Sequence, residues 1–527
     1  MRTRIVFAAG LMCTLAIAAD YKVAGDRWWA HVSYLASDAL QGRDTGSAGY
    51  EKAAQYVERQ FREMGLKPAG EHGYRQMVKF NVLRIVEQES SVSLVRNGEA
   101  EPLTLGEDAM IGLRNSMAED VDAPAEFIGH GLQIPEAHLD DLAGADLKGK
   151  IAVILAGAPQ RIPGPLAAHS QSFDERWKSL KAAGVIGIVT IANPKNSDIP
   201  WARAALARFN PTMSLADEPA SGLRFSLRMN DAHADKLFTG SGHTIAEILD
   251  KADRDEELPH FALPVRIRAH VAVERSTVES PNLAGVRPGK DPALKGEYVV
   301  LSAHLDHIGV GQPINGDAIY NGAMDNASGV AAILEVARQV QEQKLRLRRS
   351  LLFLTVCGEE KGLLGSRYFA THATVPAQSM VADVNLDMFL PLFPLRTLEV
   401  MGLDESTLGD DIRAAAAESG VAIVADRQPQ RNIFIRSDQY SFIRQGIPAL
   451  TMKFGAEPGS AEAKLEAAWL HDRYHAPSDD LNQPVDKEAV GKFEDVLVAL
   501  VKRIGNDPVA PQWNSNSFFR RFAAAQR

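Results

Sequence analysis

Residues 298–306 read YVVLSAHLD, a run of buried-type apolar residues that ends directly in a histidine and an aspartate. Three later runs share this texture: SLLFLTV at 350–356, VADVNL at 381–386 and ALTMKF at 449–454. Continuous apolar strands that alternate with amphipathic helical segments, such as 327–343, indicate a sheet covered on both faces. The sequence therefore predicts an α/β fold with a mostly parallel, mixed central sheet flanked by helices.

The chain before this region shows two different sequence patterns. Residues 50–64 space Ala54, Val57 and Phe61 three or four apart, which predicts an amphipathic helix that ends at Gly65. Later, short apolar strands alternate with proline-containing connections and a helix over 172–183, which predicts a small inserted α/β module. We therefore expect a main domain at 20–120 and 278–508, an insert at 121–277 and a tail at 509–527.

Residues 1–19 have the features of a secretory signal peptide. Arg2 and Arg4 precede an apolar run, and Ala16-Ile17-Ala18 has the small residues of a cleavage site. A retained anchor is the alternative, although the run is shorter than the roughly 20 residues that span a bilayer. We expect an exported protein, periplasmic or secreted, without membrane contact after the signal is removed.

The net charge of the chain makes some classes of binding partner unfavourable. The chain of 527 residues has 57 lysines and arginines against 67 aspartates and glutamates, a formal net charge of −10. This acidity disfavours nucleic acid and anionic membranes as partners.

The only cysteines are Cys13, within the leader, and Cys357, so the mature chain cannot form an internal disulfide. The oligomeric state stays open.

Possible metal ligands follow the predicted strands. Open α/β sheets place their sites beyond the carboxyl ends of strands, so five segments would deliver ionisable groups to one edge. Each residue alone has an ordinary reading as a buried histidine, a helix cap or a solvated acidic group. Together they indicate bound cations, because an apolar edge would not gather such groups without charge compensation. The residues are His304, Asp306, Asp325, Glu359, Glu360, Asp387 and His475.

The segments around these residues resemble the di-zinc aminopeptidase family. That family includes secreted bacterial leucyl aminopeptidases, yeast aminopeptidase Y, glutamate carboxypeptidase and the non-catalytic transferrin-receptor ectodomain. The resemblance covers most of 278–505, and DLKGKI at 146–151 is similar to the protease-associated domain often inserted in this family. Its motifs are AHLDHIG at 303–309, NGAMDNASG at 321–329, GEEKGLLGS at 358–366, NLDM at 385–388 and YHAPSDD at 474–480. Residues 42–66 resemble the family's N-terminal portion.

The resemblance implies a di-zinc exopeptidase fold with a role for each residue. Asp325 would bridge two Zn²⁺ ions, with His304 and Asp387 completing one site. Glu360 and His475 would complete the other. Glu359 would act as general base, Asp306 would orient His304, and the Asp325–Asn326 peptide bond would be cis.

Other candidates carry less weight. Arg436 and Tyr474 could contact substrate, with a salt bridge and ordinary packing as their alternatives. We expect His307 to be structural or to support the ligands, and His130 to serve a turn in the insert.

The expected function is a zinc-dependent aminopeptidase that hydrolyses the N-terminal bonds of peptides. A carboxypeptidase of the glutamate-releasing type is an alternative, because it shares the same catalytic core. A catalytically inactive receptor or binding module is the alternative of a different class, although every ligand position is filled here. The mixed nitrogen and oxygen ligands would also accept cobalt or manganese.

Overall fold

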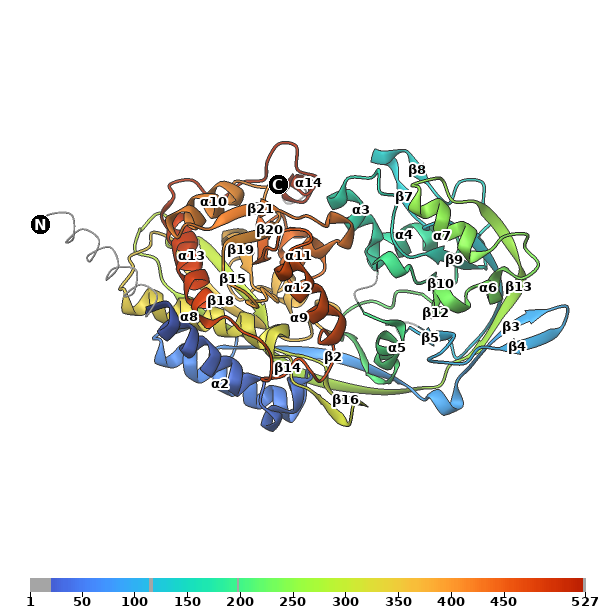
Figure 1. Ribbon diagram of the computed structural model, residues 1–527, viewed down its shortest axis with the longest axis horizontal. Helices are drawn as coiled ribbons and strands as arrows, with labels where there is room; N and C mark the ends of the chain where they lie inside the picture. Colours follow the sequence, from blue (N-terminus) through green and yellow to red (C-terminus); the bar gives the residue numbers. More distant parts are fainter. Residues whose placement is uncertain (1–19, 113–116, 197–198, 525–527) are drawn as a thin grey trace, which may run out of the picture. The chain divides into compact units, whose positions relative to one another are not determined.

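The computed structural model describes residues 20–112, 117–196 and 199–524. The predicted signal peptide, at 1–19, lies outside the described residues, as do the last three residues of the predicted tail. The chain forms two compact units (Figure 1). The first unit contains the chain up to Val78, Glu279–Arg427 and the chain from Ile433 onward; the second contains Lys79–Val278 and Gln428–Asn432.

The sheet of the first unit is mixed around a parallel centre. β15 pairs in parallel with both β18 and β19, and β19 pairs in parallel with β22. β14 and β20 join antiparallel to β18 and β22. The predicted fold class and all four predicted strands are confirmed. The order is β14 (Val273–Arg287), β18 (Ser350–Val356), β15 (Tyr298–His304), β19 (Met380–Asn385), β22 (Ala449–Phe454), β20 (Thr397–Met401) and β21 (Ala422–Ala425).

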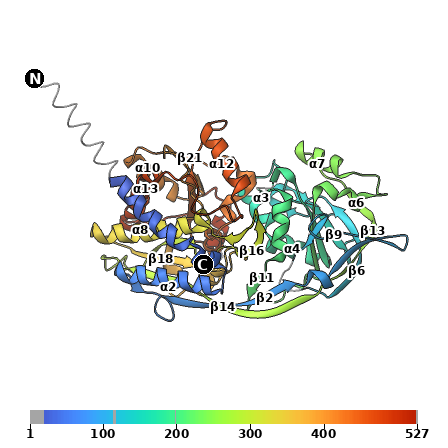
Figure 2. The same ribbon diagram turned by 60° about the horizontal axis from the view of Figure 1, so that its bottom comes forward.

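Helices cover both faces of this sheet because its strands are apolar on both sides. Alternate residues of β18, such as Leu352 and Leu354, pack with Phe369 and Phe442 of α9 and α11. α8 packs on β15 and β18, and α13 packs on β15 (Figure 2). The helices are a segment over 20–35, α2 (Ala48–Glu63), α8 (Ser328–Glu342), α9 (Leu364–Thr371), α10 (Leu408–Glu418), α11 (Gln439–Ile443), α12 (Ala461–Asp472), α13 (Lys487–Asn506) and α14 (Arg520–Ala524).

α2 shows why the local sequence forms a helix at this position. The Ser47 hydroxyl accepts a hydrogen bond from the Tyr50 amide at 3.1 Å, which caps the first turn. The predicted stripe of Ala54, Val57 and Phe61 is fully buried. Gly65 follows the helix with φ of +66°, a left-handed conformation that ends helices and suits glycine.

The second unit has its own eight-stranded sheet and core. Three of its strands precede residue 121, where the sequence placed the start of the insert. β3 pairs with β13 and β5 pairs with β12, so this segment belongs to the second sheet and the unit begins at Lys79. The order is β4 (Glu99–Pro102), β3 (Ser91–Arg96), β13 (His260–His270), β6 (Asp120–Ile128), β9 (Ile151–Leu155), β10 (Gly187–Ile191), β12 (Phe225–Met229) and β5 (Ala109–Ile111).

The boundary moves because strand pairing, and not local composition, decides where a chain segment belongs. Val92, Leu94 and Ile111 join the apolar core of the second unit, whose other members lie mostly after residue 120. The helices of this unit are α3 (Gly164–Gln171), α4 (Phe173–Ala182), α5 (Trp201–Ala204), α6 (Asp235–Phe238) and α7 (Ile245–Asp253).

Short strands complete the architecture, and two long ones run through the unit boundary. β2 (Arg75–Ile85) and β14 each contain residues of both units. No helix among the described residues is long and apolar enough to cross a membrane. The remaining strands are β1 (Lys67–Pro68), β7 (Gln133–Ile134), β8 (Leu139–Asp140), β11 (Thr212–Leu215), β16 (Gly309–Ile314) and β17 (Asp317–Tyr320).

Candidate metal centre

Three parallel strands of the first unit end in ionisable side chains. β15 ends at His304, and Asp387 lies just beyond β19. Glu359 and Glu360 follow β18 after Gly358, whose φ of 69° turns the chain out of the strand. Because these strands pair in parallel, their carboxyl ends are neighbours and bring the side chains to one edge of the sheet.

Two further segments reach the same edge. Asp325 lies in a turn, Ala323–Ala327, that directly precedes α8, and its backbone there is not helical. The peptide bond between Asp325 and Asn326 is cis, as the resemblance implied. His475 follows α12 and has a φ of 53°, in the left-handed region.

The five predicted ligands converge on a shared geometry. His304 Nε2 lies 3.3 Å from Asp325 Oδ1 and 3.3 Å from Asp387 Oδ1. His475 Nε2 lies 3.3 Å from Asp325 Oδ2 and 3.3 Å from Glu360 Oε2. The two oxygens of Asp325 thus face different histidines, which is the arrangement that a bridging carboxylate requires.

The four equal distances fit bound cations better than direct ion pairs. Nitrogen and oxygen ligands lie about 2.0–2.1 Å from a tetrahedral Zn²⁺, which places two ligand atoms about 3.3 Å apart. A charge-assisted hydrogen bond would instead bring nitrogen and oxygen to about 2.7–2.9 Å. The donor set therefore fits two adjacent ions that share Asp325.

Either His307 or His475 could complete the site formed by Asp325 and Glu360, and the interatomic distances decide between them. His307, Asp325 and Glu360 also lie close enough together to hold an ion. However, His307 Nδ1 lies only 2.7 Å from Glu360 Oε1 and 3.8 Å from Asp325 Oδ2. The short contact is a hydrogen bond, so His307 orients Glu360 while His475 faces both carboxylates.

We predicted that Asp306 would orient His304, and it does so through its backbone carbonyl and not through its carboxylate. Nδ1 of His304 donates to the backbone carbonyl of Asp306 at 3.0 Å, so the main chain orients the imidazole. The Asp306 carboxylate instead accepts the amides of Glu359 and Glu360 at 3.2 and 3.3 Å. Burial raises the pKa of Asp306 to about 6.

The electrostatics of the cluster reflect an excess of carboxylates. Burial raises the pKa of Glu359 well above its usual value, and the charges of Glu360 and Asp387 raise it further. Although burial opposes it, the carboxylates of Glu359 and Asp387 raise the pKa of His304 well above its usual value. The carboxylates thus outnumber the histidines at this edge, a balance of charge that suits bound cations.

Two functional neighbours were missed by the sequence analysis. Asp479 is fully buried, and its carboxylate accepts the amides of Met324 and Asp325 at 3.0 Å each. Asp438 is also fully buried, and its charge contributes to the raised pKa of Glu359. Asp479 falls within the YHAPSDD segment, which was the available signal; Asp438 stands beside Arg436 in a stretch that was considered only for substrate contact.

The weaker candidates lie next to the centre. The rings of Tyr474 and His475 have centroids 4.0 Å apart. Burial raises the pKa of Tyr474 well above its usual value, while the charge of Arg436 opposes that shift. Arg436 is exposed, and its contact with substrate stays a prediction. Cys357 is a buried free thiol.

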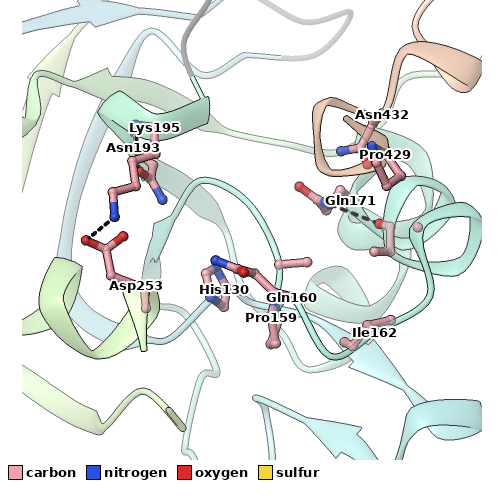
Figure 3. Close-up of a pocket in the computed structure, with 14 residues that line it drawn as sticks. His130, Pro159, Gln160, Ile162, Gln171, Asn193, Lys195, Asp253, Pro429 and Asn432 are labelled. Atoms are coloured by element: carbon pink, nitrogen blue, oxygen red, sulfur yellow. Dashed lines mark hydrogen bonds and ion pairs between the residues drawn. The ribbon is translucent and has the colours of Figure 1, made fainter. Parts of the chain in front are cut away.

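A separate cavity of about 590 Å³ lies in the second unit (Figure 3). His130 lines it between Gly129 and Gly131, which have φ of 62° and 64°, so it does belong to a turn. Its Nδ1 donates to the Leu155 carbonyl at 3.1 Å, and burial lowers its pKa to about 4. The lining includes none of the predicted site residues.

A family of known proteins matches the region of the chain that contains the candidate metal centre. Residues 282–501 match the model of peptidase family M28. Leupeptin-inactivating enzyme 1 of Streptomyces exfoliatus is 26% identical over 355 residues, which are 65% of this chain and 74% of that protein.

Two solved structures share the fold. The aminopeptidase from Aneurinibacillus sp. strain AM-1 has a TM-score of 0.55 and 22% identity, covering 94% of this chain and 97% of that chain. The zinc aminopeptidase from Bacillus subtilis has a TM-score of 0.50 and 19% identity, covering 92% and 96%. Both likenesses confirm the mixed α/β fold.

Proposed function

Since residues 282–501 belong to peptidase family M28, we propose that this chain is a zinc-dependent aminopeptidase with two metal ions. One observation carries the proposal: two triads of ligand atoms share Asp325, with 3.3 Å between each histidine and its two carboxylates. His304 and Asp387 would complete one site, and Glu360 and His475 the other. The Bacillus subtilis relative is itself described as a zinc enzyme.

Two Zn²⁺ ions held in this way would activate a water molecule and polarise the scissile carbonyl. Glu359 would take the proton from that water and pass it to the leaving amine. Its raised pKa suits a group that must both accept and return a proton. The Asp306 carboxylate accepts the amide of Glu359 at 3.2 Å, which supports the backbone position of the proposed base.

The choice of aminopeptidase over carboxypeptidase is supported by relatives. Both solved structures that share the fold are described as aminopeptidases. A leucyl anilide and a peptide with a blocked amino terminus distinguish the two activities. We expect hydrolysis of the anilide alone, and hydrolysis of only the blocked peptide would replace the proposal with a carboxypeptidase.

Metal dependence and the general base are tested together. Dialysis against a chelator should abolish activity, and added Zn²⁺ should restore it. Glu359→Gln should lower kcat by about 10²–10⁴-fold while the variant still binds two zinc ions per chain. Full activity of either the metal-free enzyme or the Glu359→Gln variant would contradict the proposal.

We also propose that residues 1–19 direct export and that the second unit is a protease-associated domain, which the resemblance of residues 146–151 supports. The basic start, apolar run and small-residue site support the first proposal. N-terminal sequencing of protein recovered outside the cytoplasm should begin near Asp20. A full-length chain beginning at Met1 in that fraction would argue against cleavage.

A further inference from the structure

We propose that Arg43, Asp44 and Thr45 form a clamp that sets the positions of the metal-binding loops, with Arg43 as its main positioning residue. The inference rests on the proposed metal centre and concerns how this chain holds it. All three residues belong to the first unit and lie in the loop between the first helical segment and α2.

Arg43 joins two ligand-bearing loops through backbone carbonyls. Its side chain is fully buried, and Nε donates to Leu305, the residue between His304 and Asp306, at 3.0 Å. Nη1 and Nη2 donate to the carbonyls of Asn321 and Gly322 at 2.6 and 3.0 Å, just before the turn that carries Asp325. The Arg43 carbonyl in turn accepts the amide of His307 at 3.3 Å.

Asp44 and Thr45 fix the third loop. The Lys361 side chain is only 5% exposed, and its Nζ lies 2.8 Å from Asp44 Oδ1. The Thr45 hydroxyl accepts the amide of Gly358 at 2.9 Å. These two contacts bracket Glu359 and Glu360, the proposed base and ligand, so three consecutive residues contact every loop at the ends of β15 and β18 and the turn before α8.

The side chain at position 43 must be arginine for a geometric reason. A guanidinium carries five donors on three nitrogen atoms in a rigid fork, whereas a lysine ammonium carries three donors on a single atom and cannot reproduce that spacing. Burial lowers the pKa of Arg43 to about 10, while the charges of Asp479, Asp306, Asp325 and Glu360 oppose that shift. The desolvated cation is thus maintained beside the acidic cluster.

The main test measures metal affinity apart from activity. Metal-free wild type, Arg43→Lys and Arg43→Met are titrated with Zn²⁺ in competition with a chromophoric chelator. Both variants should bind zinc at least about ten-fold more weakly, the scale found for groups that orient metal ligands. Wild-type affinity in folded Arg43→Met would overturn the proposal. Wild-type affinity in Arg43→Lys would overturn the geometric role, because charge alone would then suffice.

Arg349→Met is the matched control for loss of a buried arginine. Arg349 is also buried, and it binds Glu297 Oε2 at 2.6 Å and the Ile504 carbonyl at 3.0 Å, away from the ligand loops. We expect this variant to lower Tm while zinc affinity stays within two-fold of wild type. An equal loss of affinity in Arg349→Met would show that the effect of Arg43 is general destabilisation.

A milder variant covers the case in which Arg43 variants do not fold. Thr45→Val keeps the shape but leaves the Gly358 amide without its acceptor, so kcat should fall about three- to ten-fold with KM unchanged. Thr45→Ser should restore kcat. An unchanged kcat in Thr45→Val would remove Thr45 from the clamp. If wild type binds zinc but cleaves no peptide, the affinity changes still test the clamp while the proposed function fails.

Discussion

At the scale of single residues, the centre depends on side chains that hold backbone amides as much as on the ligands. Asp306 holds the amides of Glu359 and Glu360, and Asp479 holds those of Met324 and Asp325. His304, Glu360, Asp387 and Asp325 could be predicted because each follows an apolar strand or precedes a helix, whereas His475, which follows α12, was indicated by its motif. Asp479 and Arg43 could not, because their partners lie far away in the chain and only the fold shows that they are buried.

Asp479→Asn should destabilise the protein and weaken metal binding. The carboxylate accepts the amides of Met324 and Asp325 and the Gln483 Nε2 at 2.9 Å, whereas an asparagine offers one acceptor and an opposing donor. We expect a loss of about 1–3 kcal/mol in the free energy of unfolding, measured by urea denaturation.

Asp480→Asn provides the adjacent control. Asp480 is partly exposed, and its Oδ1 accepts the Asn482 amide at 2.7 Å, a role that an asparagine oxygen can keep. Its effect should stay within about 0.5 kcal/mol. Equal losses in the two variants would contradict a special role for Asp479.

At the scale of secondary-structure elements, local patterns predicted the helices and strands well. The stripe of α2 and the apolar runs of β15 and β18 are confirmed because burial imposes their periodicity. For β3 and β5 the sequence did not indicate which unit the strands join. They are short, and their partners β12 and β13 lie more than a hundred residues later, so pairing could not be read from the segment itself.

Gly65→Ala tests the end of α2. A Cβ there would meet only Gln341 Nε2 at 3.7 Å, so the cost comes from φ of +66° and not from a clash. We expect a loss of about 1–2 kcal/mol in unfolding free energy by urea denaturation. Gly296→Ala, which adds a Cβ in open space without a left-handed φ, should be neutral or slightly stabilising. A neutral Gly65→Ala would contradict the assigned role of the turn.

The contact between α8 and α13 predicts a pH-dependent term in stability. Glu494 is fully buried, and burial followed by the charge of Glu335 raises its pKa well above 4.5. When the pKa of an acid is higher in the folded than in the unfolded protein, its contribution to stability is complete below the unfolded-state pKa. That contribution is lost as the pH rises toward the folded-state pKa. Glu494→Gln should therefore raise the urea midpoint at pH 8 and leave it nearly unchanged at pH 4.

That substitution keeps a useful hydrogen bond. Gln339 Nε2 donates to Glu494 Oε2 at 2.9 Å, and a glutamine oxygen can accept the same bond. A midpoint that rises equally at both pH values would show that charge is not the cause.

At the scale of the whole molecule, each unit has its own apolar core, and the proposed ions belong to one of them. Calorimetry should therefore resolve a transition that depends on zinc and another that does not. At a free zinc concentration 100 times Kd, binding adds about 2.7 kcal/mol to the first unit, which corresponds to a rise of about 4 °C in its Tm. Both transitions moving together on chelation would contradict independent units.

The span of the Arg43 contacts has a consequence for synthesis. Arg43 and its partner Leu305 are separated by 262 positions, and Arg43 and Asn321 by 278. A ribosome must therefore make residues 79–278 and β15 before the first of these hydrogen bonds can form. His475, a proposed ligand, emerges later still, so the proposed metal centre cannot be complete until most of the chain has been made.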